Sequence, residues 1–131
     1  GWRVAIEQPA EPAGDIAGVV SLNGAALSTS GDYRNFFEVG GQRYGHIMDP
    51  RTGRPVSGPL AAVSVIAETG AQASALATAL FVLGPDSAVA WGNRHPDVGV
   101  LVLDRRDGAV RPRWSDGLRP ALDSSTAMPL R

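Results

Sequence analysis

The segment from residue 62 to residue 84 constrains the fold more than any other part of the chain. It opens on the β-branched run Val63-Ser64-Val65-Ile66, which favours a buried strand. Thr69 is a suitable N-cap for a helix over residues 70–83, and Gly84-Pro85 is a strong stop signal. Because alanine, leucine, phenylalanine and valine cover most of this helix, we expect it to be largely buried.

The rest of the chain predicts short strands separated by turns. Asn23-Gly24 between apolar runs is a strong β-hairpin signal, and Gly40-Gly41 is a second one. The first turn would pair strands 16–22 and 25–28, and the second would pair strands 35–39 and 42–48. Further elements are predicted as a strand at 2–6, a loop at 49–60, a short helix at 86–93, and strands at 98–103 and 109–114. The expected class is α/β (an α+β mixture), mostly strands with one long buried helix.

Composition indicates an ordinary globular domain. The chain has 131 residues, of which 44% are hydrophobic, so a core can be buried. The net charge of -1 and the lack of a long basic run argue against nucleic-acid or membrane-surface partners. No apolar run approaches the roughly 20 residues of a membrane span, so we expect no membrane contact by this segment. Without cysteine, disulfides, thiolate zinc sites and cysteine nucleophiles are excluded.

Two features leave alternatives open. The chain opens without methionine on residues that already favour a strand, so we expect it to be an incomplete domain. Four arginines gather near the C-terminus, at Arg105, Arg106, Arg111 and Arg113. A solvated hairpin is the favoured interpretation of this cluster, and a phosphate site is the alternative.

Two segments outside the helix carry polar groups suited to chemistry. Residues 28–33, Ser-Thr-Ser-Gly-Asp-Tyr, end a predicted strand and could present backbone N–H groups to an anion, although an Asx-type turn is the simpler interpretation. Residues 44–53 hold His46 at a strand end, in a loop stiffened by proline and glycine. If the strand continues, Tyr44, His46 and Met48 share one face. A histidine there suits acid–base work at neutral pH, and a surface or packing role is the alternative.

Ser74 and Thr78 form a third candidate within the predicted helix. They are four residues apart and therefore share one helical face. Their hydroxyls could bond back to carbonyls of the preceding turn, or they could face a polar site. Spacing alone does not decide between the two.

These segments together resemble the ApbE-type FAD:protein FMN transferases. The resemblance is carried by residues 26–56, ALSTSGDYRNFFEVGGQRYGHIMDPRTGRPV, and by residues 63–84, VSVIAETGAQASALATALFVLG. It continues more weakly to Leu103. It implies an ApbE (T-fold-like) domain, of which residues 1–131 form the C-terminal part, while the N-terminal half of the domain supplies much of the FAD pocket.

The resemblance also implies a reaction. A threonine hydroxyl of an acceptor flavoprotein attacks the FMN phosphorus of FAD in a magnesium-dependent step, and AMP leaves. The implied acceptor is a subunit of a respiratory electron-transport complex. The implied location is periplasmic or otherwise extracytoplasmic, as an inner-membrane lipoprotein anchored through an N-terminus outside this sequence. Attack on a pyrophosphate requires neutralisation of charge and a base for the incoming hydroxyl, which is consistent with a cation and a histidine.

The family pattern assigns expected roles to individual residues. By resemblance His46 is the acid–base residue, and His46, Ile47 and Met48 contact the flavin. Ser74 and Thr78 stand at the metal positions. At position 74 the family usually carries aspartate, and Mg²⁺ prefers charged oxygen ligands, so a weakened site is expected. The alternative function is a non-catalytic flavin-binding or scaffold domain of the same fold that has lost its metal site.

Overall fold

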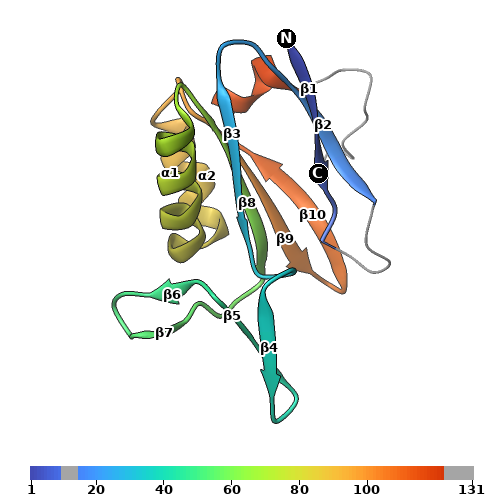
Figure 1. Ribbon diagram of the computed structural model, residues 1–131, viewed down its shortest axis with the longest axis vertical. Helices are drawn as coiled ribbons and strands as arrows, with labels where there is room; N and C mark the ends of the chain where they lie inside the picture. The colour runs from blue at the N-terminus through green and yellow to red at the C-terminus, as the bar shows by residue number, and fades with distance from the viewer. Residues whose placement is uncertain (10–14, 123–131) are drawn as a thin grey trace.

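A four-stranded antiparallel sheet in the order β10-β9-β8-β3 forms the centre of the molecule (Figure 1). The computed structural model describes residues 1–9 and 15–122. The strands of this sheet are β3 (Ala26–Gly31), β8 (Leu60–Ala67), β9 (Gly99–Arg106) and β10 (Ala109–Trp114). All eight residues of β8 are buried, because neighbouring strands flank it and other elements cover both of its faces.

Two helices cover one face of the sheet (Figure 1). They are α1 (Gly70–Leu83) and α2 (Pro85–Asn93). Ala73, Ala77 and Leu80 of α1 join Val65 of β8 and Val100 of β9 in one apolar cluster. Since Val65 and Val100 are opposite each other across the β8–β9 ladder, the helix side of the sheet is continuous.

The opposite face is covered by a separate antiparallel pair, β1 (Trp2–Glu7) and β2 (Ile16–Leu22), and by the 3₁₀ helix η1 (Asp116–Ala121). Ile6, Val20 and Leu118 pack against Leu101 and Leu103 of β9 in a second apolar cluster. The domain therefore has three layers, with the sheet in the middle.

The connection between β3 and β8 holds two small ribbons that extend away from these layers (Figure 1). One pairs β4 (Phe36–Val39) with β5 (Gln42–Gly45), and the other pairs β6 (Met48–Asp49) with β7 (Arg54–Pro55). Gly40 and Gly41 both have positive φ, at 61° and 76°, as a tight two-residue hairpin turn requires. Every residue of β4 is exposed.

The locally encoded elements match their predictions. The helix at 70–83 has the predicted bounds, and its N-cap Thr69 accepts a hydrogen bond from the Gln72 N–H at 3.2 Å. The strand at 109–114 and the Gly40-Gly41 hairpin are also confirmed. The mixed, strand-rich class is confirmed as well. No helix in the described part of the chain is long and apolar enough to cross a membrane.

Two local predictions were wrong, and both errors have a tertiary cause. The strands flanking Asn23-Gly24 do not pair with each other, because β2 pairs with β1 and β3 pairs with β8. Ala17 and Val20 of β2 and Leu27 of β3 pack in the same apolar cluster, but each strand reaches it by pairing with a different partner. Strand β5 also ends at Gly45, and Met48 belongs to β6, so Tyr44, His46 and Met48 do not lie along one strand face.

Helix α1 is also less buried than its composition indicates. Only Ala73, Ala77, Leu80 and Phe81 are buried, and Leu83 is 49% exposed. The sheet covers one side of the helix, while the side that carries Ser74 and Thr78 is exposed. The two hydroxyl residues are therefore on an accessible face.

Candidate functional site

His46 lies in the bend between β5 and β6, with its ring exposed. Its Nδ1 is 3.1 Å from the carbonyl oxygen of Asn35. A carbonyl oxygen can only accept, so Nδ1 carries the proton of the neutral ring and donates it. The lone pair is then on Nε2, which is the nitrogen able to take up a proton from a reacting group.

The two residues after His46 differ in their exposure. Ile47 is buried, with 7% of its surface exposed, and packs in the cluster below α1, while its carbonyl accepts the Val56 N–H at 2.8 Å. The side chain of Ile47 therefore stabilises the fold, and any ligand contact at this residue would come from its backbone N–H. Met48 is 50% exposed and can offer its side chain to a ligand.

The Thr78 hydroxyl bonds back to the preceding turn, and it also has a second partner outside the helix. Thr78 Oγ1 donates to the Ser74 carbonyl at 3.3 Å, which is a bond to the preceding turn. The same Oγ1 is 3.0 Å from Ser30 Oγ, so Ser30 is the donor of that second bond. Ser30 belongs to the 28–33 segment noted in the sequence as an anion candidate. Its specific position opposite α1 follows only from the tertiary structure.

The described residues do not fit Mg²⁺ on their own. No group of three or more histidine, aspartate or glutamate side chains in the described ranges is close enough to hold a metal ion. Ser74 and Thr78 supply neutral hydroxyls, whereas Mg²⁺ usually keeps its waters unless charged oxygens or phosphates hold it. A metal at this position would need charge from another source.

An ion pair fixes Asp32, which lies three residues before Asn35, the residue that bonds the His46 ring. Arg105 binds Asp32 through both guanidinium nitrogens, NH2 to Oδ1 at 2.7 Å and NH1 to Oδ2 at 3.1 Å. The two side chains are only 32% and 18% exposed, and such bidentate pairs are geometrically specific. A Cβ built on Gly45 would lie 3.1 Å from the Cβ of Asp32, so β5 approaches this anchor closely.

The loop after β6 is organised by Asp49. Its carboxylate accepts the Arg51 backbone N–H at 2.9 Å and the Arg51 guanidinium at 2.8 to 3.3 Å. These hydrogen bonds from the side chain and backbone of Arg51 hold the pKa of Asp49 below its usual value. Asp49 therefore stays ionised at neutral pH and shapes the turn. That is consistent with a structural role for the Asp49–Arg51 pair.

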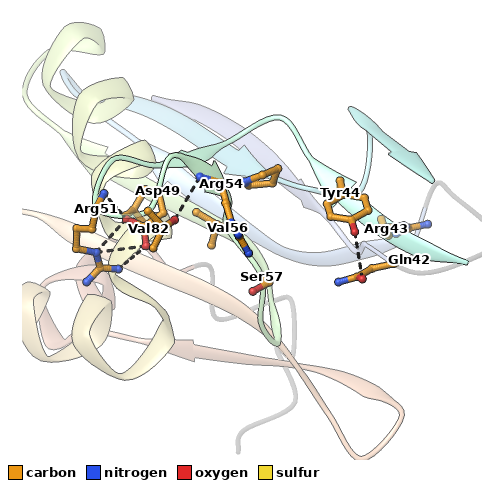
Figure 2. A pocket seen from close by; sticks show the side chains of 11 residues that line it. Gln42, Arg43, Tyr44, Asp49, Arg51, Arg54, Val56, Ser57 and Val82 are labelled. Carbon is orange, nitrogen blue, oxygen red and sulfur yellow. Dashed lines mark hydrogen bonds and ion pairs between the residues drawn. The ribbon is translucent and has the colours of Figure 1, made fainter. Parts of the chain in front are cut away.

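A cleft of about 620 Å³ separates the two ribbons (Figure 2). One side consists of Gln42, Arg43 and Tyr44 of β5. The remaining lining residues come from the β6–β7 ribbon, the residues after it and α1, and they are Asp49, Arg51, Thr52, Arg54, Pro55, Val56, Ser57 and Val82. The walls of the cleft are joined through the bend that holds His46.

The arginines near the C-terminus are mostly paired. Besides the Arg105 pair, Arg106 Nε donates to the buried Asp104 at 2.6 Å, and Arg113 donates to Asp86 at 2.7 Å. Their positive charge is thus largely neutralised by neighbouring carboxylates. This supports a structural hairpin over a phosphate site for the cluster.

Comparison with known proteins identifies the family. The model of the ApbE family matches residues 1–102. This chain belongs to the ApbE family. Among curated ApbE relatives, the FAD:protein FMN transferase of Escherichia coli K12 is 48% identical over 87 residues, which cover 66% of this chain and 25% of the relative. The FAD:protein FMN transferase of Vibrio cholerae is 38% identical over 123 residues, which cover 92% of this chain and 36% of the relative.

Solved ApbE structures have the same fold. The ApbE protein of Thermotoga maritima matches with a TM-score of 0.79 and 31% identity, over 94% of this chain and 38% of that chain. The apo flavinyl transferase ApbE of Pseudomonas stutzeri matches with a TM-score of 0.75 and 37% identity, over 92% of this chain and 37% of that chain. The chain therefore spans well under half the length of these ApbE proteins.

Proposed function

We propose that this chain is the C-terminal part of the catalytic domain of an FAD:protein FMN transferase. Such an enzyme transfers FMN from FAD to a threonine hydroxyl of an acceptor flavoprotein and releases AMP. The observation that carries this proposal is the match to a named FAD:protein FMN transferase across 92% of the chain. Because the aligned region covers 92% of this chain, it includes the positions of His46, Ser74 and Thr78.

His46 is the proposed general base. The threonine oxygen of the acceptor forms a bond to the FMN phosphorus, while the bond from that phosphorus to the AMP oxygen breaks. The hydroxyl proton passes to Nε2 of His46, and AMP leaves with the negative charge. The hydrogen bond from Nδ1 to the Asn35 carbonyl supports this role, because it holds the ring and places the lone pair on Nε2.

The proposed flavin contacts are His46, the backbone of Ile47, and Met48. The exposure of the His46 ring and of half of Met48 supports this assignment. The hydroxyls of Ser30 and Thr78 are polar groups on the open side of α1, where an anionic part of FAD could be bound.

We further propose that Ser74 and Thr78 would hold Mg²⁺ only weakly, and that the ion would depend on the negative charge of the FAD phosphates. The absence of a carboxylate at position 74 is the reason for a weak site. The same observation supports the alternative function, a flavin-binding domain of this fold without catalysis. As in the expectation from the sequence, the proposed acceptor is a subunit of a respiratory electron-transport complex, and the proposed location is the periplasm or another extracytoplasmic space.

The test is a transfer assay with the full-length protein, FAD, Mg²⁺ and a purified acceptor subunit. If the protein is a transferase, mass spectrometry should detect a flavin adduct on one acceptor threonine, and chromatography should detect an equal amount of AMP. FAD binding without adduct and without AMP would support the non-catalytic alternative instead. Cell fractionation with an antibody against the protein tests the proposed location.

A further inference from the structure

The cleft between the two ribbons is bordered by an unpaired strand edge. Strand β5 pairs with β4 alone, and no other described strand lies beside it. Gln42, Arg43 and Tyr44 all line the cleft, although successive side chains of a strand point to opposite faces. Three consecutive lining residues therefore mean that the cleft runs along the edge of β5, where backbone N–H and C=O groups have no strand partner.

The cleft lies next to the chain segments that carry the candidate catalytic groups. His46 is not a lining residue, but it directly follows β5 and directly precedes Ile47 and β6, so it belongs to the bend that joins the two walls. Val82, which also lines the cleft, lies one helical turn after Thr78 on the same side of α1. A chain bound in the cleft would thus lie next to the bend that contains His46 and next to the last turn of α1.

Charge in the cleft is unbalanced. Three arginines and one aspartate line it, which gives a net charge of +2 at neutral pH. Arg51 is bound by Asp49, and Arg43 lies 3.7 Å over the ring of Phe36, with Glu38 at 4.0 Å. Arg54 is exposed, and its guanidinium has no acidic partner within the described ranges. Figure 2 shows Arg54 between the Asp49–Arg51 pair and Tyr44.

We propose that this cleft binds an extended, acidic segment of the acceptor protein. The segment pairs through its backbone with the edge of β5 and places a carboxylate on the guanidinium of Arg54. The proposal rests on the proposed function, because a transferase that modifies a protein needs a surface for the chain that carries the threonine. An unpaired strand edge matches the backbone of an extended polypeptide, while Arg54 supplies charge complementarity.

The test measures peptide binding by fluorescence anisotropy on the full-length protein, without FAD. The probe is a fluorescein-labelled nine-residue peptide with a central threonine flanked by four aspartates, and its control carries asparagine at those four positions. The aspartate peptide should bind more tightly at low salt and lose this advantage at high salt. Arg54→Ala should weaken its binding about tenfold, and Arg54→Glu should weaken it further. Arg94→Ala, an exposed arginine outside the cleft lining, is the matched control and should bind as the unmodified protein does.

Strand pairing has a separate readout. Amide hydrogen exchange of Arg43 should slow when the aspartate peptide is added, because the alternating pairs of the β4–β5 hairpin leave its N–H pointing to the free edge, where the peptide would bond it. Thermal unfolding of each variant checks that the exposed Arg54 can be replaced without loss of the fold.

Several results would overturn the proposal. Equal binding of the two peptides, no binding of the aspartate peptide, or unchanged exchange in β5 would each do so. If Arg54→Ala weakens FAD binding and leaves peptide binding unchanged, the cleft belongs to the nucleotide and the proposal is wrong. Because the peptide assay needs no transfer, a protein that binds the peptide as expected but forms no adduct contradicts the proposed function alone.

Discussion

Ser30 Oγ lies 3.0 Å from Thr78 Oγ1, although 48 residues separate the two in the chain. This contact joins the end of β3 to the exposed face of α1, so that two polar segments of the sequence meet at one place. Since Thr78 Oγ1 already donates to the Ser74 carbonyl, its remaining capacity is as an acceptor. With one bond accepted from Ser30, this oxygen keeps one lone pair that could contact a cation.

Ser74→Asp is expected to tighten Mg²⁺ binding in the presence of FAD. The substitution adds one formal negative charge on the helical face shared with Thr78, and Mg²⁺ favours charged oxygens. Calorimetric titration of the full-length protein with and without FAD measures the change. The unmodified protein should bind Mg²⁺ negligibly when FAD is absent. Ser74→Ala is the matched control and should give no gain, whereas equal affinity of Ser74→Asp and the unmodified protein would contradict the assignment.

If His46 is the general base as proposed, His46→Ala is expected to lower FMN transfer by at least about 100-fold, because the attacking hydroxyl would lose its base. The ring is exposed, so the fold should survive, which circular dichroism checks. His95→Ala is the control, since His95 stacks on Trp91 at 3.8 Å between ring centroids and is bonded to the end of α2. Unchanged turnover in His46→Ala would remove that residue from the mechanism.

Leu80→Ala is expected to lower the free energy of unfolding by roughly 2–5 kcal/mol, because Leu80 is 1% exposed and its removal leaves a cavity under α1. Urea unfolding measures the difference. Leu83→Ala on the same helix is the matched control, because Leu83 is 49% exposed, and should cost less than about 1 kcal/mol. Equal losses for the two variants would show that the orientation of α1 is wrong.

Arg51→Gln is expected to raise the pKa of Asp49 toward its usual value of about 3.9. The hydrogen bonds from Arg51 lower the folded-state pKa, so their stabilising effect is complete above that usual value and is lost as the pH falls through the lowered pKa. The pair should therefore hold the turn at neutral pH and release it only in acid. Carboxyl-carbon NMR titration of Asp49 measures the shift, with Arg54→Gln as the neighbouring control. An Asp49 pKa that is the same with and without Arg51 would contradict the pairing.

Local chemistry made several elements predictable from the sequence. The bounds of α1 followed from Thr69 and from Gly84-Pro85, because a cap and a stop act on the adjacent backbone alone. The β4–β5 hairpin followed from Gly40-Gly41 for the same reason, since positive φ is required at both positions. The segment that holds His46 was found by its composition and by its resemblance to the family.

Pairing between distant segments could not be predicted in this way. The Asn23-Gly24 signal predicted a hairpin, yet β3 pairs with β8 because a strand pairs where its apolar side is buried, and that depends on the whole core. The exposure of the Ser74 side of α1 likewise depends on how much of the helix the sheet covers.

The sequence by itself determined the family, the bounds of the long helix and the identity of His46 as a candidate, because each rests on the order of residues along the chain. Only the tertiary structure decided what these residues meet. It placed the Asn35 carbonyl on the His46 ring, Ser30 on Thr78, and Arg105 on Asp32 across 73 residues. Such contacts are set by the packing of the helices and the β1–β2 pair on the two faces of one sheet, which no local signal encodes.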